Sequence, residues 1–449
     1  MLDAGTAVET ESVDDEARRS EAPRRASAAD TGGRFWFGIA CAVALGAAVR
    51  FTYLFHAAPA LVLGDGLDYH HSALRLADGL GFTSGLGDIG AEKAHHPPGW
   101  ITVLAAVAEA GWRSMRAQQV TGVVLGLGVI VLAGLIGRRY ADRRVGVLAA
   151  FAAAAYPGFW VLDAQILSEP LGLLIVGVLM LVLADLWHRP TPARAVLAGA
   201  ALGALALVRS EQLALLVIAV APILLLNQRI TLKRRLAWTG AATLTALVLI
   251  APWTIHNLGR FEEPVVLSSN VGSTLLAGNC PPTTYTGDLI GHYDVTCNRE
   301  RSARMPDLDR SQHDIEARNL AFENMRDNVD RLPATVVARH GRTIGVFRPA
   351  QTVEHAASWM GSATWPVWAW VASFWLVAAL AIYGSVVLRR SRTFQWPLVA
   401  PLLITLLVVT VAYGEPRYHT PADLGVIVLA AVGLDWLMRR WNDLRKASS

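Results

Sequence analysis

The stretch AQQVTGVVLGLGVIVLAGLIG, residues 117–137, contains no charged residue. Its length is close to the roughly 20 residues that a helix needs to cross the hydrocarbon core of a bilayer. Two further stretches, residues 236–255 and 396–413, are also apolar and uncharged. These runs predict an all-α, polytopic membrane protein.

The composition agrees with this fold class. Of the 449 residues, 53% are hydrophobic and only 17% are charged, which is typical of membrane proteins rather than of two or three soluble domains. The formal net charge of +4 does not indicate a nucleic-acid partner. The positive charges are clustered in short loops between apolar runs, where they determine topology.

The first 33 residues are rich in Glu, Asp, Arg, Ser and Ala and have no apolar periodicity. They also lack the short apolar core of a cleaved signal peptide. We expect residues 1–33 to form a disordered cytoplasmic tail.

The basic loops orient the chain. About ten transmembrane helices place all of them, and both chain ends, on the cytoplasmic side. A short interfacial helix is expected at residues 97–112. The expected spans are 35–57, 117–137, 145–159, 170–187, 195–208, 212–226, 236–255, 359–388, 396–413 and 421–438.

This threading divides the chain into modules. Residues 34–255 form an N-terminal membrane module, expected to be catalytic, with a first outer loop at 58–116. A long outer loop follows at 256–358. Residues 359–449 supply the C-terminal membrane helices and a short cytoplasmic tail.

The polar motifs fall on the outer side, opposite the basic loops. Ionisable residues near membrane depth are costly, so their convergence at one face indicates a functional site. The motifs are GDGLDYHH (64–71), EKAHHPPGW (92–100), LDAQILSEP (162–170), VRSE (208–211), PWTIHN (252–257) and GEPRYH (414–419).

Two of these motifs carry the acidic candidates for catalysis, GDGLDYHH and LDAQILSEP. Asp65 precedes a predicted surface helix, whose dipole favours the carboxylate form, although a helix N-cap explains the same residue. Asp163 and Glu169 are each also explained as acids near a helix start. Two outer acidic loops together, however, match a site that holds a base near an acceptor hydroxyl, with or without a cation.

Lys93, Arg209, Arg348 and Arg417 are outer positive charges expected near the membrane surface, where a lipid-linked phosphate would lie. Arginine binds phosphate through two parallel hydrogen bonds. The alternative is that these side chains extend to lipid headgroups, which is common for interfacial Arg and Lys.

Histidines and cysteines give weaker signals. The pairs His70–His71 and His95–His96 lack the spacing of zinc ligands, so hydrogen bonding is favoured over metal binding. Cys280 and Cys297 share the long outer loop, and both a disulfide and a reduced pair fit their spacing. The sequence has no Gly-rich phosphate loop, nucleophile elbow or CxxC motif in a suitable context.

Taken in order, several fragments resemble one family across residues 35–438. The family is the C-type (GT-C) polyprenyl-phosphate-dependent glycosyltransferases, close to the bacterial relatives of protein mannosyltransferases (family 39) and of the lipid A aminoarabinose transferase. The fragments are GDGLDYHHSALRLADGLGF (64–82), HHPPGW (95–100), SEP (168–170), LVRSEQL (207–213), APWTIHN (251–257) and GEPRYHTP (414–421).

The resemblance implies an inverting transfer in which Asp65, four residues before Tyr69, is the catalytic base. Asp68, Asp163 and Glu169 would position the acceptor or a cation. Donor-phosphate or substrate contacts are implied for Tyr69, Lys93, His96, Arg209, Glu211, Arg417 and His419. Two positions depart from the pattern: Gly66 stands where many relatives have glutamate, and His256 where relatives often have arginine.

We therefore expect a membrane glycosyltransferase that moves a hexosyl or pentosyl group to an acceptor hydroxyl at the outer face of a bacterial cytoplasmic membrane. Its partners would be a polyprenyl-phosphate-sugar donor, a protein, glycan or lipid acceptor, and membrane lipids, without nucleic acid. No motif demands a cofactor, although the acids are compatible with a divalent cation such as Mg or Mn. The alternatives are a transporter or lipid flippase, which usually has a mid-membrane site and repeated halves, and a non-catalytic scaffold of envelope assembly.

Overall fold

The computed structural model describes residues 11–86 and 89–447. Within these ranges the chain is helical, and its one β-type pairing is an isolated bridge between Thr83 and Glu92. The predicted all-α fold is confirmed.

Six helices are long and apolar enough to cross a membrane, or seven if a bent pair counts as one span. The pair consists of α5 (Arg143–Ala155) and α6 (Pro157–Asp163), which meet at an angle of 52°. The six helices are α1 (Glu11–His56), α4 (Met115–Tyr140), α7 (Glu169–His188), α10 (Leu232–Leu258), α16 (Thr364–Arg390) and α18 (Thr420–Ala447).

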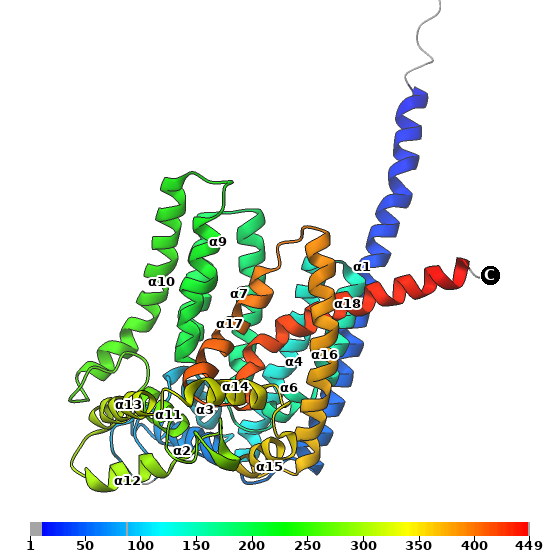
Figure 1. Ribbon diagram of the computed structural model, residues 1–449. Helices are drawn as coiled ribbons and strands as arrows, with labels where there is room; N and C mark the ends of the chain where they lie inside the picture. Colours follow the sequence, from blue (N-terminus) through cyan, green and yellow to red (C-terminus); the bar gives the residue numbers. More distant parts are fainter. Residues whose placement is uncertain (1–10, 87–88, 448–449) are drawn as a thin grey trace, which may run out of the picture.

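Shorter apolar helices complete the bundle (Figure 1). They are α8 (Pro192–Ala206), the segment η1 (Ser210–Ala214), η2 (Leu216–Val220) and α9 (Ala221–Leu225), and α17 (Trp396–Val411). With the long helices and the bent pair they match the ten predicted spans, so the polytopic architecture is confirmed.

The start of α1 differs from the prediction. The helix begins at Glu11, so residues 11–33, expected to be disordered, continue it. This segment is rich in Ala, Arg and Glu, which have high helix propensity. Residues 1–10 of the expected tail lie outside the described residues.

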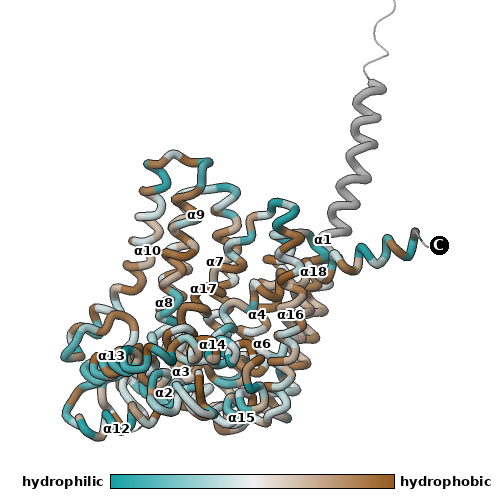
Figure 2. The backbone as a smooth tube through the Cα atoms, viewed as in Figure 1, coloured by the Kyte–Doolittle hydropathy of each residue, from teal (hydrophilic) through white to brown (hydrophobic). Residues whose placement is uncertain are grey.

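Close helix packing depends on small residues. In α16, a Cβ on Gly384 would lie 1.9 Å from the backbone oxygen of Leu429 in α18. Only glycine permits this approach, and small residues serve the same purpose in membrane bundles generally. Figure 2 shows hydrophobic residues along the helices of the bundle and hydrophilic residues concentrated at its two ends.

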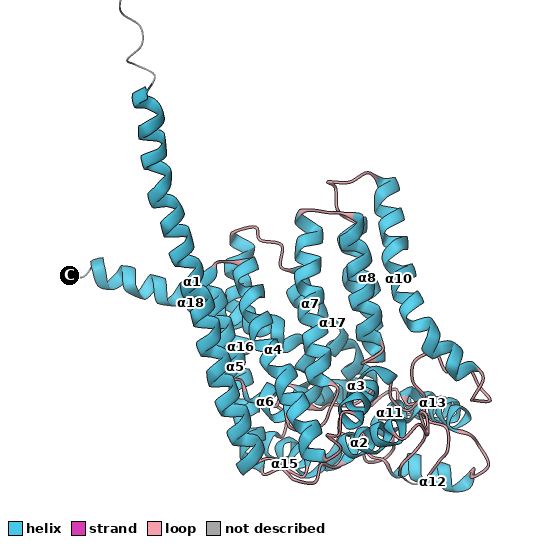
Figure 3. Ribbon diagram, turned by 180° about the vertical axis from the view of Figure 1, so that it is seen from behind, coloured by secondary structure: helices cyan, strands magenta, loops and turns pink. Residues whose placement is uncertain are grey.

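A layer of shorter helices covers one end of the bundle, opposite the arginine-containing loops that follow α7, α9 and α16 (Figures 1 and 3). We call it the extramembrane layer. Cys280 and Cys297 form a disulfide within it. Its elements are α2 (Gly64–Ala77), α3 (Pro98–Glu109), α11 (Val271–Gly278), η3 (Gly287–Leu289), α12 (Thr296–Arg304), α13 (Arg310–Asp327), α14 (Leu332–Thr343) and α15 (Pro349–Met360).

Candidate functional site

A cavity of about 530 Å³ lies where the extramembrane layer meets the ends of the membrane helices. Its size falls within the roughly 300–1,000 Å³ of small-ligand sites. Acidic and basic side chains from distant parts of the chain line it. They include Asp65, Tyr69, His96, Glu169, Arg209, Glu211, Tyr293, Glu415 and Arg417.

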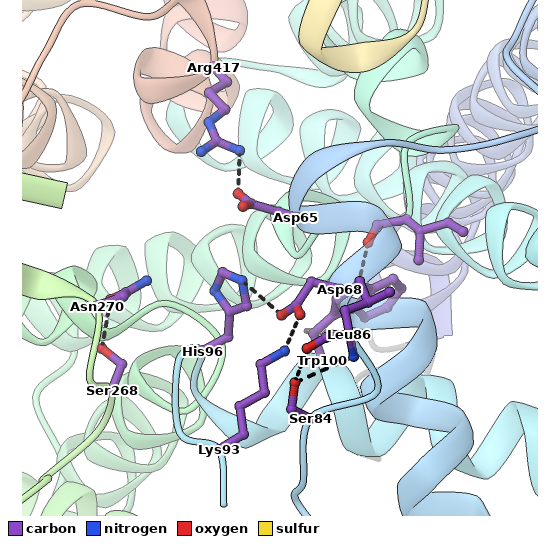
Figure 4. Close-up of polar contacts among 11 residues, drawn as sticks. Asp65, Asp68, Ser84, Leu86, Lys93, His96, Trp100, Ser268, Asn270 and Arg417 are labelled. Carbon is purple, nitrogen blue, oxygen red and sulfur yellow. Dashed lines mark hydrogen bonds and ion pairs between the residues drawn. The ribbon is translucent and has the colours of Figure 1, made fainter. Parts of the chain in front are cut away.

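Asp65 lies in the first turn of α2, just inside the helix that it was predicted to precede. Its Oδ2 accepts a hydrogen bond from Arg417 NH1 at 2.8 Å, and the two residues are 352 positions apart. Figure 4 shows the two side chains pointing toward each other. The Asp65 side chain is 34% exposed and that of Arg417 is 17% exposed, so the pair is within reach of a ligand in the cavity.

Electrostatics keep Asp65 ionised. Burial is the largest single effect and acts to raise the pKa of Asp65, but Arg417, His96 and His95 together outweigh it, and the pKa lies below its usual range. A carboxylate with a depressed pKa is a weak base while its cationic partner stays in place. Release of Arg417 would make Asp65 more basic.

Close packing requires a glycine at position 66, directly after Asp65. A Cβ at Gly66 would lie 2.3 Å from the backbone oxygen of Gln165, so no side chain fits there. In the same loop Ile166 has a φ of +54°, and its carbonyl accepts a hydrogen bond from Trp100 Nε1 at 3.0 Å. The close approach of Gly66 to Gln165 holds Asp65 on α2 against the loop that leads to Glu169.

A second charged group lines the cavity. Arg209 donates from NH1 to Glu169 Oε1 at 2.8 Å and from Nε to Glu211 Oε1 at 2.7 Å. Glu169 is almost fully buried at 3% exposure, whereas Glu211 is 31% exposed. The structure therefore brings together the SEP and VRSE motifs, and of the two acids Glu211 is the one accessible to a ligand.

Asp68 and Lys93 form an ion pair beside the cavity but are not among its lining residues. The second carboxylate oxygen of Asp68 lies 3.7 Å from His96 Nε2. The His96 ring stacks on Tyr69 with centroids 4.4 Å apart. In Figure 4, Lys93 and His96 point toward Asp68, while Asp65 points away from it toward Arg417. We interpret Asp68 and Lys93 as supports for the Tyr69–His96 wall.

Two predicted site residues lie elsewhere. Asp163 does not line the cavity: its Oδ2 accepts from Arg50 Nε at 2.7 Å in the bundle core, where the two side chains are 1% and 0% exposed. A buried carboxylate requires a cationic partner, and α1 supplies it. His419 is also buried away from the cavity, with its Nδ1 2.7 Å from Asp423 Oδ1. The role predicted for Asp163, positioning the acceptor or a cation, does not fit its position. The substrate contact predicted for His419 does not fit its position either.

Several lining residues were not selected from the sequence. Tyr293 comes from the long loop, and Glu415 lies two residues before Arg417. Burial raises the pKa of Glu415 to about 7, against the effect of Arg417. The Arg417 guanidinium also lies 4.8 Å from the Trp359 ring. Glu415 belongs to the quoted motif GEPRYH, which was its only sequence signal.

The acidic candidates do not fit a divalent-cation site around Asp65. Each pairs with a cationic side chain: Asp65 with Arg417, Asp68 with Lys93, and both Glu169 and Glu211 with Arg209. Within the described ranges, the group of three acidic, His or Cys side chains with ligand atoms close together is a different one, His292, His355 and Glu415. Positive side chains occupy the places beside the acids that Mg or Mn would take.

A family model supports the sequence fragments. The model described as dolichyl-phosphate-mannose-protein mannosyltransferase matches residues 95–256. The predicted resemblance to the C-type glycosyltransferases is confirmed. The matched residues include His96, Glu169, Arg209 and Glu211. None of the curated proteins matches the sequence.

Solved structures share the fold. An oligosaccharyltransferase of Archaeoglobus fulgidus, crystallised with zinc and sulfate, matches with a TM-score of 0.54 and 13% identity over 90% of this chain and 49% of that chain. The archaeal oligosaccharyltransferase AglB of A. fulgidus, in complex with an inhibitory peptide and a dolichol-phosphate, gives 0.51 and 14% over 92% and 52%. The chain thus spans about half the length of these structures.

A third match is ArnT from Cupriavidus metallidurans bound to undecaprenyl phosphate. Its TM-score is 0.41, with 16% identity over 88% of this chain and 77% of that chain. That score is too low to support an argument.

The effect of Arg417 on Asp65 predicts a change in pH dependence. In Arg417→Gln, burial is no longer offset by the guanidinium, so the pKa of Asp65 should rise by about 1–3 units. If Asp65 must be ionised for turnover, activity should fall at a correspondingly higher pH as the solution is acidified. The measurement is the pH profile of kcat/KM, with Arg417→Lys as the charge-retaining control. If the pH profiles of kcat/KM for wild type and Arg417→Gln coincide at acidic pH, this electrostatic coupling is contradicted.

Proposed function

We propose that this protein transfers a sugar from a polyprenyl-phosphate donor to an acceptor hydroxyl, with Asp65 as the base and Arg417 as the donor-phosphate ligand. The observation that carries the proposal is the accessible Asp65–Arg417 pair in the wall of a cavity at the membrane boundary. The resemblance to lipid-phosphate-dependent enzymes supports it, as does the dolichol-phosphate bound to the archaeal relative.

The pair suggests an order of events. A phosphate group of the donor is a better bidentate ligand for a guanidinium than a single carboxylate oxygen is. When the phosphate engages Arg417, Asp65 loses its cationic partner and becomes more basic. Donor binding would therefore activate the base at the moment when the leaving group is in place.

The chemical step then involves one proton and one sugar. Asp65 takes the proton of the acceptor hydroxyl as its oxygen attacks the anomeric carbon of the sugar. The bond from that carbon to the phosphate oxygen breaks, and its electron pair stays on the phosphate, where Arg417 stabilises the added charge. Attack from the face opposite the leaving phosphate inverts the configuration.

The acceptor would enter from the side of Glu211. This carboxylate is 31% exposed and can accept hydrogen bonds from sugar or serine-type hydroxyl groups. Arg209 fixes Glu211 relative to Glu169 through its two hydrogen bonds. Asn270 lines the same cavity from the extramembrane layer.

We also propose that the cavity faces outward from a bacterial cytoplasmic membrane, with both chain ends in the cytoplasm. Arginine-containing loops at the other end of the bundle favour this orientation. A disulfide between Cys280 and Cys297 supports it as well, because disulfides persist in oxidising compartments.

The central test of function is Asp65→Asn, which removes the base and keeps the side-chain shape. Loss of general-base catalysis predicts a decrease in turnover of at least ~100-fold. The measurement is release of undecaprenyl phosphate from undecaprenyl-phosphate-linked mannose or aminoarabinose, with the cell-envelope fraction as the acceptor source.

Asp78→Asn is the matched control. Asp78 follows α2 and pairs at the surface with Arg113, so its loss should leave turnover unchanged. Thermal melting should report folded protein for both variants. Turnover of Asp65→Asn within a few-fold of wild type would exclude Asp65 as the base.

The orientation is tested by thiol labelling. Thr286 is exposed in the extramembrane layer, and Ser391 is exposed in the loop after α16. In a Cys41→Ser background, a membrane-impermeant maleimide added to intact cells should label Thr286→Cys and not Ser391→Cys. The reverse labelling pattern would overturn the proposed orientation.

A further inference from the structure

Three potential metal ligands meet beside the cavity. Glu415 lies just before η4 (Pro416–His419), His292 follows η3, and His355 belongs to α15. One ligand atom from each residue lies within 4.8 Å of the others. Both imidazoles are 3.9 Å from the same atom, Glu415 Oε1, through His292 Nδ1 and His355 Nε2.

Several polar atoms of this group lack good partners. Glu415 is 2% exposed, and neither carboxylate oxygen makes a hydrogen bond of good geometry, although the Trp359 side chain interacts with it. Nε2 of His292 and Nε2 of His355 are also buried and unpaired. Buried polar atoms with so few partners are unfavourable. A bound ion would satisfy Glu415 and His355.

The Nδ1 atom of His292 is the nitrogen nearer to Glu415. It accepts a hydrogen bond of 3.1 Å from the backbone N–H of Tyr293, so its single lone pair is engaged. An ion at this nitrogen would replace that hydrogen bond.

The loop that carries His292 is held in place before any ion binds. The backbone N–H of Gly414 donates to Gly291 O at 2.9 Å, which fixes this loop beside Glu415. Arg342 donates from Nε to the Ile290 carbonyl at 2.7 Å.

Arg342 also links this loop to α15. Its NH2 donates to Gln351 Oε1 at 2.7 Å, and Gln351 is one turn before His355 on the same helix. The guanidinium thus ties the loop that carries His292 to the helix that carries His355.

We propose that His292, His355 and Glu415 bind one first-row transition-metal ion, with zinc the best match. Two imidazoles and one carboxylate are borderline ligands that zinc favours, in a site with a fourth position for water or ligand. Bond lengths of ~2.0–2.2 Å place tetrahedral ligand atoms about 3.4 Å apart. The observed 3.9 Å separations need only a small closure around the ion.

The ion would connect three segments that are far apart in sequence. Glu415 lines the cavity, so the open coordination position would face it. Arg417 follows Glu415 by two residues, and fixing Glu415 would therefore restrict the position of the Arg417 guanidinium. The site is distinct from the Asp65 pair, and its existence does not depend on the proposed function.

The test is metal binding by the full chain without a polyhistidine tag, purified in detergent. After loading with ZnCl2 and gel filtration in metal-free buffer, mass spectrometry should find about one zinc per chain. Replacement by Co²⁺ should give the intense visible absorption of a tetrahedral site. Zinc should also raise the melting temperature of EDTA-treated protein.

The variants His355→Gln and Glu415→Gln should weaken zinc binding at least tenfold. His340→Gln is the matched control, because His340 lies in α14 of the same layer and its ring contacts Thr410 of α17, outside the group. Gel filtration and melting curves identify any variant that fails to fold, and wild-type stoichiometry remains decisive in that case. Wild-type protein that retains no zinc and no cobalt, or variants that bind as wild type does, would overturn the proposal. None of these measurements requires transferase activity.

Discussion

The pairing of Asp65 with Arg417 is the interaction on which the site depends. It joins α2, the first helix of the extramembrane layer, to the segment that begins the last membrane helix. The pair keeps a carboxylate ionised and a guanidinium oriented in a partly desolvated place, where either group alone would be costly. A ligand phosphate can compete for the guanidinium, and this competition would couple donor binding to activation of the base.

The need to pair charges also explains how the other charged groups of the site are arranged. At the boundary of a bilayer an unpaired charge is unfavourable, and the acids of the site have partners supplied by distant segments. Arg209 joins the start of α7 to η1, and Arg50 joins α1 to α6. Within the described residues, Glu415 is an exception: it is buried, and the closest imidazole nitrogens remain 3.9 Å away. That exception is the physical basis for the proposed metal site.

The sequence predicted those features that depend on local pattern. Apolar length and charge predicted the spans, and the motif around Asp65 predicted a helix with the acid at its N-terminal end. Long-range pairing could not be predicted in this way. Asp163 has the same local setting as a site acid, but Arg50, inside an apolar run, pairs with it in the core. His292, His355 and Glu415 carry no spacing signal, because three separate segments bring them together.

The most direct test of the account is the affinity for undecaprenyl phosphate of wild type, Asp65→Asn and Arg417→Gln, measured by fluorescence because Trp359 lies 4.8 Å from the Arg417 guanidinium. If phosphate must displace Asp65 from Arg417, removing the Asp65 charge should strengthen binding by about two- to fivefold, the equivalent of a partly exposed ion pair of up to ~1 kcal/mol. Arg417→Gln should bind more weakly than wild type. Equal or weaker binding by Asp65→Asn would contradict the competition between donor phosphate and catalytic base.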